Sequence, residues 1–335
     1  MALGFFVLLL AACAGGNPAG SGAGENKDAS ADSGKADKKQ TRLVKHKYGE
    51  TEIPASPKRI VSFNLEDMTL SLQLPLVLAA PHGENYYLEP KLKERGIPTT
   101  IWSTGAISFE AILASNPDLI LSTASIDQST YDQMNKIAPT IVFNRDDWRA
   151  SIVEIGKALG MEEKANAVVK GYDDKVKQAK ADIAQAVGEG KTVAFLRTSA
   201  KTLQLYFPTY MAGGAAFPTY VGVVYNDLGL KPLAKVTELS KSSPDKQNAL
   251  ISQETLPELN PDYLFVTVGG SVASNDAMLK NDAEYAELQQ LALWKAIPAV
   301  ANGKVFKVSA QHWISNGPIA DEMKIADVVR ALGKK

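Results

Sequence analysis

The chain has 335 residues, of which 45% are hydrophobic and 22% are charged, with 36 Lys and Arg against 37 Asp and Glu. This length predicts two globular units, and the formal net charge of -1 gives no reason to expect a nucleic-acid partner, because duplex binders usually contain a basic domain. A single cysteine excludes an internal disulfide and a cysteine-rich metal site, and three histidines disfavour a His-rich metal cage.

The N-terminus contains an apolar segment followed by a cysteine. Residues 3–12 are apolar or Gly, too few to span a bilayer, and fit the hydrophobic part of a secretory signal. Leu10-Ala11-Ala12-Cys13 resembles the lipobox of bacterial lipoproteins, in which cleavage leaves a lipidated Cys13. We therefore predict a signal peptide over residues 1–12, although residues 1–3 lack the usual basic charge. The alternative is a cysteine buried in a core segment.

A polar segment follows the cysteine. Residues 14–40 contain no aromatic or β-branched residue. Such a segment cannot bury enough apolar area to offset the entropy lost on ordering. We predict that residues 13–40 are a lipidated cysteine and a disordered tether, which attach a folded body to a membrane.

From residue 41 onward short strands alternate with helices, a pattern typical of a helix-covered, mainly parallel sheet. The predicted strands are residues 60–63, 76–80, 118–121, 141–143, 193–196, 263–268 and 304–308. The predicted helices are residues 67–74, 107–115, 131–137 and 319–332, with a helical turn at residues 225–228. Apolar residues at helical spacing predict one long helix over Glu162–Val187, between the two halves.

The two halves share a repeated motif. Ile107-Ser108-Phe109-Glu110 returns as Ile251-Ser252-Gln253-Glu254, and Asn116-Pro117-Asp118 returns as Asn260-Pro261-Asp262. Both pairs are offset by 144 residues, from 107 to 251 and from 116 to 260. Pro and Asn at the end of a helix explain the second pair alone, but they do not explain both in one register. The sequence therefore predicts two similarly folded lobes.

Four further segments carry a resemblance to a known family. They are Pro57-Lys58-Arg59-Ile60-Val61, Ile137-Ala138-Pro139-Thr140, Gly156-Lys157-Ala158-Leu159-Gly160 and Gly317-Pro318-Ile319-Ala320. With the lipobox, the tether and the long helix, they make the chain similar to the substrate-binding lipoproteins of iron–siderophore ABC importers. The resemblance implies an α/β fold of two Rossmann-like lobes, residues 41–161 and 189–335, bridged by a rigid helix over residues 162–188.

The resemblance also implies a function. A ferric siderophore is expected to bind between the lobes and to pass to the membrane permease of an ABC importer. The siderophore oxygens already saturate Fe(III), so no cofactor or metal is expected to bind the protein directly, and aromatic walls with a few donors suffice. The expected protein is a monomer held by the Cys13 lipid at the extracytoplasmic face of the cell membrane, with no nucleic-acid partner and no enzymatic activity.

The candidate ligand-binding residues follow from strand ends and from aromatic residues in loops. Arg197 follows the first strand of the second lobe, where open α/β sheets bind their ligands. A planar guanidinium suits anionic siderophore oxygens. The other candidates are Trp102, Trp313 with His312, and, more weakly, Tyr86 and Tyr220. The alternatives are a surface arginine and tryptophans buried in the core. Arg145 and Arg149, which flank Trp148, are not selected.

Two glutamates are candidates for contact with the permease. In the family, one glutamate on each lobe pairs with permease arginines, and Glu110 and Glu254 occupy the matching motif positions. An acid in the first turn of a helix also interacts favourably with the helix dipole, which is the local alternative.

Other functions remain open at this point. No nucleotide-binding or nucleophile motif stands at a strand-to-helix turn, which disfavours an enzyme. Haem, cobalamin or another metal chelate could occupy the same architecture, whereas direct Zn or Mn binding requires His and carboxylates that converge. Among siderophores, hydroxamate or citrate types are favoured over triscatecholates, because only Arg197 is identified as a cationic residue of the cleft.

Overall fold

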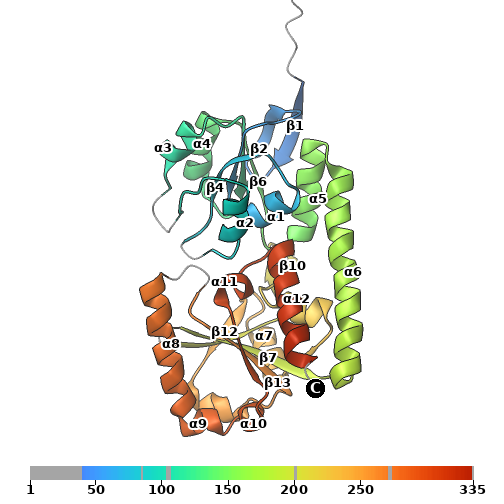
Figure 1. The fold of residues 1–335 in the computed structure, drawn as a ribbon, viewed down its shortest axis with the longest axis vertical. Helices are drawn as coiled ribbons and strands as arrows, with labels where there is room; N and C mark the ends of the chain where they lie inside the picture. Colours follow the sequence, from blue (N-terminus) through green and yellow to red (C-terminus); the bar gives the residue numbers. More distant parts are fainter. Residues whose placement is uncertain (1–39, 84–85, 103–106, 200–201, 271–273, 334–335) are drawn as a thin grey trace, which may run out of the picture. The chain divides into compact units, whose positions relative to one another are not determined.

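The first lobe contains a four-stranded parallel sheet in the order β4-β3-β5-β6. A computed structural model describes residues 40–83, 86–102, 107–199, 202–270 and 274–333 (Figure 1). The four strands are β3 Ile60–Phe63, β4 Leu76–Ala80, β5 Leu119–Thr123 and β6 Thr140–Phe143. Nearly every residue in them is buried, as expected for parallel strands covered on both faces. The sequence predicted all four.

Short helices and one hairpin surround this sheet. The helices are α1 Glu66–Ser71, α2 Glu89–Glu94, α3 Phe109–Ala114, α4 Gln128–Ile137 and α5 Trp148–Leu159. The antiparallel hairpin is formed by β1 Thr41–His46 and β2 Gly49–Pro54. The hairpin was not predicted, because β1 is mostly exposed and its residues show little apolar alternation.

The long helix α6 spans Glu162–Val187, as predicted. Its buried side chains are Ala165, Tyr172, Ala179 and Ile183, which recur on one face of the helix. That face packs against α5 of the first lobe and against α12, Pro318–Leu332, at the end of the chain. The Tyr172 hydroxyl donates a hydrogen bond of 2.7 Å to Asp227, so α6 is tied to the second lobe by a polar contact as well.

The second lobe contains a six-stranded mixed sheet, in which β12-β8-β7-β13-β14 are consecutive and β11 also pairs with β7. Its strands are β7 Thr192–Ser199, β8 Thr202–Tyr206, β11 Lys231–Pro232, β12 Asn248–Ile251, β13 Tyr263–Val268 and β14 Val305–Val308. β7, β11, β13 and β14 are parallel, whereas β8 and β12 pair antiparallel with their neighbours. The predicted α/β class is confirmed, with a more mixed second sheet than expected.

Helices and a small hairpin complete the second lobe (Figure 1). The hairpin is β9 Thr209–Ala212 with β10 Ala215–Pro218. The remaining elements are the π-helix η1 Val223–Asp227, α7 Ala234–Ser242, the 3-10 helix η2 Gln253–Glu258, α8 Asn275–Gln290, α9 Ala292–Lys295, α10 Pro298–Ala301 and α11 Ala310–Trp313.

The repeated Asn-Pro-Asp motif performs the same task in both lobes. Asp118 accepts hydrogen bonds from the backbone N–H groups of Lys58 and Arg59, at 2.7 and 2.9 Å. Asp262 accepts one from the backbone N–H of Thr192, at 2.7 Å. Each aspartate thus holds the start of the first strand of its own sheet, β3 or β7. The two motifs therefore occupy equivalent places in two similarly built lobes.

Buried polar contacts join the two lobes. Asp67 on α1 accepts hydrogen bonds from the backbone N–H groups of Ile319 and Ala320 in the first turn of α12. The Trp148 indole N–H donates to Asp321 at 2.8 Å. Burying polar groups is costly unless each finds a partner, so these contacts specify how the lobes meet.

Candidate functional site

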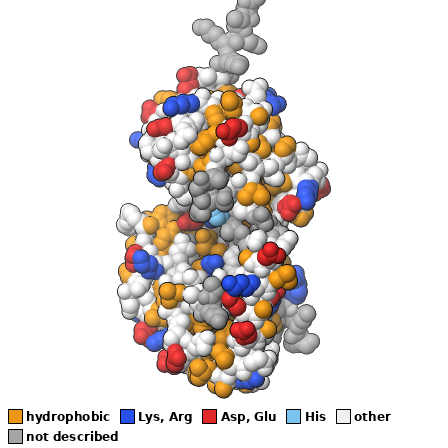
Figure 2. Space-filling model, turned by 90° about the vertical axis from the view of Figure 1, so that its left-hand side faces the viewer, with side chains coloured by type: hydrophobic (Ala, Val, Ile, Leu, Met, Phe, Trp, Pro, Cys, Tyr) orange, Lys and Arg blue, Asp and Glu red, His pale blue; other side chains and the backbone are white. Residues whose placement is uncertain are grey.

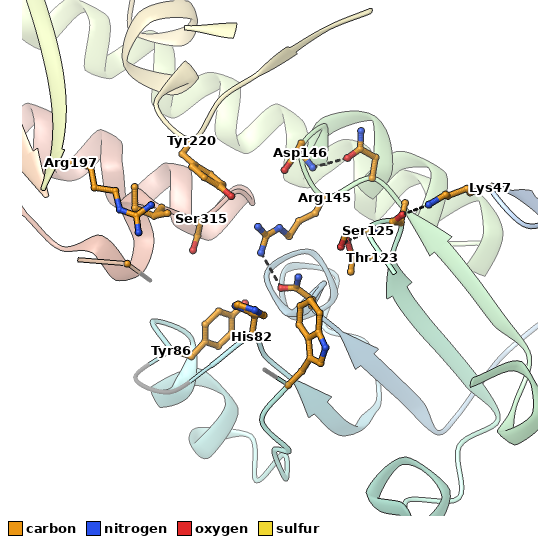
Figure 3. Close-up of a pocket in the computed structure, with 16 residues that line it drawn as sticks. Lys47, His82, Tyr86, Thr123, Ser125, Arg145, Asp146, Arg197, Tyr220 and Ser315 are labelled. Carbon is orange, nitrogen blue, oxygen red and sulfur yellow. Dashed lines mark hydrogen bonds between the residues drawn. The ribbon is translucent and has the colours of Figure 1, made fainter. Parts of the chain in front are cut away.

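A pocket of about 680 Å³ lies between the two lobes (Figure 3). The first lobe contributes Lys47, Asn64, His82, Tyr86, Trp102, residues 123–125 and residues 144–146, and the second contributes Arg197, Tyr220, Gly270, Ile314 and Ser315. On the face drawn in Figure 2, acidic and basic side chains are interspersed over both lobes. The pocket, by contrast, contains mainly basic, hydroxyl and aromatic groups.

The strands explain why these residues meet. Asn64 follows β3, Thr123 ends β5, and Asn144 follows β6, so all three lie at the carboxyl edge of the first sheet. In the second sheet Arg197 lies near the carboxyl end of β7, and Gly270 comes two residues after β13. Open α/β sheets bind ligands at this edge. The pocket is therefore formed where the carboxyl edges of the two sheets face each other.

Arg145 lies at the centre of the pocket, held by Asn64 (Figure 3). Its Nη1 donates a hydrogen bond of 3.0 Å to the Asn64 side-chain oxygen. Asn64 has a positive φ of 55°, a conformation that Asn tolerates better than most residues. The Asn64 backbone N–H donates to the Glu66 carboxylate at 3.0 Å. Glu66 thus stabilises the turn that contains Asn64, and the Asn64 side chain holds the Arg145 guanidinium.

Arg197 is held in a similar way on the opposite wall. Its Nε donates to the Gly269 carbonyl at 2.6 Å, and its Nη1 donates to the Tyr206 hydroxyl at 3.3 Å. A Cβ at Gly270 would lie 2.9 Å from Arg197 Nη2, so a glycine there leaves room for the guanidinium. Both arginines are half-buried.

Two further charged groups lie at the edges of the pocket. The Lys47 ammonium donates to the Ala124 carbonyl at 2.7 Å. Asp146 accepts hydrogen bonds from the Tyr210 hydroxyl at 2.7 Å and from the Asn316 side-chain amide at 3.0 Å. Because Tyr210 and Asn316 belong to the second lobe, Asp146 links the lobes beside the pocket.

Aromatic side chains form the remaining walls. The Trp102 ring lies 5.2 Å from the Phe63 ring and 4.5 Å from the His82 ring, measured between centroids. The Tyr86 hydroxyl donates to Glu66 at 3.3 Å. Burial, with a smaller effect of the Arg145 charge, lowers the pKa of His82 and keeps it neutral at pH 7. Burial raises the pKa of Glu66 to about 7.

The structure brings four of the six predicted ligand-binding residues to this pocket: Arg197, Trp102, Tyr220 and Tyr86. Trp102 is half-buried, so its indole is accessible from the pocket. Arg197 lies within β7, two residues before its end, whereas the sequence placed it just after the strand.

Trp313 and His312 lie outside the pocket, which corrects the prediction that they line it. Trp313 is 0% exposed, stacked between the rings of Phe195 and Phe265 with both centroid distances 5.2 Å. The Trp313 indole N–H and the His312 Nε2 both bond to Asp327. Both side chains are carried by α11, which packs against α12. This short helix was not predicted, because the segment was interpreted as a loop.

Arg145 is the main residue that the sequence interpretation did not select. The sequence nevertheless contained a signal for a binding residue here, because Arg145 follows the predicted strand at residues 141–143 by two residues. The rule that selected Arg197 applies equally to that strand end. Arg149, by contrast, bonds to Asp173 at 2.6 Å and lies 3.5 Å from Asp227, outside the pocket.

The two candidate docking glutamates are exposed, one in each lobe. Glu110 lies in the first turn of α3, where the Ser108 side chain accepts a hydrogen bond from the Ala111 N–H. Glu254 lies in the first turn of η2, and a hydrogen bond from Ser252 lowers the pKa of its carboxyl. Cys13 and the predicted signal and tether, apart from residue 40, lie outside the described residues.

Within the described ranges, no three His, Cys, Asp or Glu side chains converge as a metal site would require. In the same ranges no helix combines the length and the apolar character needed to cross a membrane.

Comparison with known proteins identifies the family. The model of the family described as periplasmic binding protein matches residues 78–311. The chain belongs to the periplasmic binding protein family. The resemblance of this periplasmic binding protein to the substrate-binding components of iron–siderophore ABC importers is confirmed by its relatives and by related structures.

Two relatives and two solved structures illustrate this similarity. The iron(3+)-hydroxamate-binding protein FhuD of Bacillus subtilis is 29% identical, over 98% of this chain and 96% of FhuD. The Fe(3+)-citrate-binding protein YfmC of the same organism is 25% identical, over 90% of each chain. Staphylococcus aureus SirA, solved in complex with staphyloferrin B, has a TM-score of 0.70 at 27% identity and covers 88% of this chain and 99% of SirA. A periplasmic binding protein of a Fep/Fec-like ferrichrome ABC transporter from Bacillus subtilis has a TM-score of 0.69 at 27% identity, over 87% of this chain and 100% of that protein.

Proposed function

We propose that this periplasmic binding protein captures a ferric siderophore in the pocket between its lobes and delivers it to the permease of an ABC importer. The observation that carries the proposal is that Arg145 and Arg197 lie on opposite walls of one pocket of about 680 Å³. Relatives named for binding ferric hydroxamates and ferric citrate support it. The bound iron is cargo held within the siderophore.

The side chains of the pocket suit a chelate whose iron is already coordinated. Each guanidinium donates planar, charge-assisted hydrogen bonds to ligand oxygens. Trp102 and Tyr86 supply apolar surface for the organic shell of the chelate. Ser125 adds an exposed hydroxyl group to the pocket. This set orients an intact complex by its outer atoms.

The contacts between the lobes limit how far they move. The Asp67 carboxyl accepts a hydrogen bond from the first turn of α12, and the Trp148 indole donates one to Asp321. The helix α6 packs against elements of both lobes. A continuous helix resists bending more than a strand hinge does, so we propose small closing motions on binding.

Delivery requires a surface that the permease recognises, and we propose that Glu110 and Glu254 provide it. Both are exposed, and each has an exposed leucine near it in sequence: Leu113 is 62% exposed and Leu250 is 70% exposed. Charge pairs at a rim steer docking and fix register. The double variant Glu110→Ala/Glu254→Ala should abolish siderophore-dependent iron uptake in cells while leaving the ligand affinity of the purified protein unchanged. Unchanged uptake would contradict the docking role of Glu110 and Glu254.

We further propose that Cys13 carries a lipid that anchors a monomer at the extracytoplasmic face of the membrane. Relatives described as lipoproteins support this part of the proposal. Metabolic labelling with a palmitate analogue should label the wild-type protein and leave Cys13→Ser unlabelled. Equal labelling of the two would contradict the anchor.

A ligand panel tests the proposed function. Tryptophan fluorescence of the full chain is titrated with a ferric trishydroxamate, ferric citrate, a ferric triscatecholate, haem and cobalamin. Saturable quenching at submicromolar concentration by a ferric siderophore, recovered chemically intact by mass spectrometry, is the expected result. Binding of haem or cobalamin alone would replace the ligand, and a degraded siderophore would indicate an enzyme.

A further inference from the structure

We propose that the pocket selects a ferric chelate of net negative charge that presents free carboxylates, with Arg145 and Arg197 as the residues that receive them. This inference rests on the proposed function and narrows it to one ligand class. The geometry that points to it is a set of three basic side chains, Arg145, Arg197 and Lys47, lining one pocket. Figure 3 shows the two arginines entering it from opposite lobes.

None of these three basic groups forms an ion pair with any carboxylate in the part of the chain that the structure describes. Their hydrogen-bond acceptors are an amide oxygen, a hydroxyl and backbone carbonyls, all of which are neutral. A half-buried guanidinium without a counter-ion is costly, and a bound anion removes that cost.

Two basic groups outside the pocket that are half-buried or buried do find carboxylates. Arg149 lies only four residues from Arg145 and bonds to Asp173 at 2.6 Å. Lys324 is fully buried and bonds to Asp321 at 2.8 Å. Carboxylates thus pair with these two cations, whereas Arg145 and Arg197 have only neutral hydrogen-bond acceptors among the described residues.

The acidic groups near the pocket offset only part of its positive charge. Asp146 is engaged by the Tyr210 hydroxyl and the Asn316 amide. Glu66 does not line the pocket and accepts hydrogen bonds from the Tyr86 hydroxyl and from the Asn64 N–H. Burial raises the pKa of Glu66 to about 7, so the group is partly protonated at neutral pH. Three basic side chains therefore face Asp146 and a glutamate that is partly protonated.

The arginines have donors left for a ligand. Arg145 uses Nη1 for Asn64, and Arg197 uses Nε and Nη1 for Gly269 and Tyr206. Within the described residues no hydrogen bond is made by the Nη2 group of either arginine. A free carboxylate matches the guanidinium fork. In a triscatecholate every charged oxygen is bound to iron, whereas a citrate-type chelate presents carboxylate at its periphery, which favours the citrate type.

The test compares chelates that differ in charge, using the full-length protein. The probes are a net-neutral ferric trishydroxamate, a net-negative ferric citrate-type siderophore and a ferric triscatecholate. Dissociation constants are measured by fluorescence at low salt and at 0.5 M salt. The citrate-type chelate should bind at least about 10-fold more tightly than the neutral one at low salt, and this preference should shrink at high salt.

Matched variants test whether the arginines of the pocket cause the preference for the negatively charged chelate. Arg145→Gln should weaken binding of the citrate-type chelate at least about 30-fold, because truncating one partner of a buried charge pair is costly, and should weaken the neutral chelate far less. Arg149→Gln, four residues away and outside the pocket, should leave both affinities unchanged. Arg197→Gln provides a second variant if Arg145→Gln does not fold, as judged by its circular dichroism.

The possible results distinguish failure of the charge preference from failure of the proposed function. Equal or tighter binding of the neutral chelate, or equal losses for both chelates in Arg145→Gln, would overturn the charge preference and leave the proposed function standing. Tightest binding of the triscatecholate would overturn the carboxylate class. Binding of no ferric chelate would instead overturn the proposed function itself.

Discussion

Gly317 leaves the space that Asp67 occupies: a Cβ at Gly317 would lie 2.3 Å from the Asp67 Cγ. Gly317 also has a φ of 149°, which side-chain-bearing residues rarely adopt. The close approach lets the Asp67 carboxylate reach the N–H groups of Ile319 and Ala320 at the start of α12. A carboxyl group of the first lobe thus accepts hydrogen bonds from two N–H groups at the start of α12 that lack partners within the helix.

Gly317→Ala should therefore lower the free energy of unfolding by about 2–5 kcal/mol, through backbone strain and displacement of Asp67. Gly171→Ala is the matched control, because Gly171 lies within α6 with open space around it. That change should raise stability by about 0.5–1 kcal/mol. Chemical denaturation measures both, and equal effects of the two changes would contradict the proposed role of Gly317.

Stability should fall as the pH rises from about 4 to about 7. Burial raises the pKa of both Glu66 and Asp67 to about 7, from ordinary values of 4.5 and 3.8. In this window the folded state binds more protons than the unfolded state, so raising the pH favours unfolding. The Glu66 contribution is up to about 3 kcal/mol, and it is fully lost above pH 7.

Glu66→Gln isolates this contribution from histidines that titrate in the same range. The variant should show a smaller loss of stability between pH 4 and pH 7 than the wild type, measured by urea denaturation at each pH. Parallel curves for the two proteins would show that Glu66 does not titrate in this window.

Substitution of Trp102 and of Trp313 should have opposite effects on fluorescence quenching by ligand and on stability. Trp102 lines the pocket, whereas Trp313 is enclosed by Phe195 and Phe265. Trp102→Phe should remove most of the fluorescence quenching by ligand and leave the melting temperature nearly unchanged. Trp313→Phe should retain the quenching and lower stability by about 1–3 kcal/mol, because the bond to Asp327 is lost. The reverse pattern would place the ligand elsewhere.

Lys324 should affect binding without touching the ligand. Its buried ammonium donates to the backbone carbonyls of Tyr220 and Ser315, both pocket residues, and to the Asp321 carboxylate. Lys324→Met leaves Asp321 buried without its cation, a change that costs about 3–5 kcal/mol. We expect weaker ligand binding and lower stability, measured by calorimetry.

Lys324→Met/Asp321→Leu separates the two effects. Removing both charges should restore much of the stability, because the isolated buried charge is gone. Ligand affinity should stay reduced, since the Tyr220 and Ser315 carbonyls still lack their donor. Full recovery of affinity would mean that Lys324 does not position the pocket.

The sequence predicted the regular elements best where burial left a clear pattern. Continuous apolar runs identified β3 through β6, and helical spacing identified the full length of α6. The exposed β1–β2 hairpin and the antiparallel strand β8 were missed, because neither has a long apolar run.

The site was predicted only in part, for a physical reason. A strand end identifies residues such as Arg197, but it does not say which way a loop tryptophan turns. Trp102 faces the pocket, whereas Trp313 is drawn inward by stacking on two rings and by Asp327, contacts that come from distant parts of the chain. Arg145 was not selected, although it stands two residues after a predicted strand.

The most direct test of the proposed function is the position of iron in crystals of the protein with its ferric siderophore, located by anomalous scattering at the iron edge. We expect one iron peak in the pocket between Arg145 and Arg197, surrounded by siderophore oxygens, with no protein atom coordinated to it. A peak coordinated by protein side chains, or one placed beside His312 and Asp327, would contradict it.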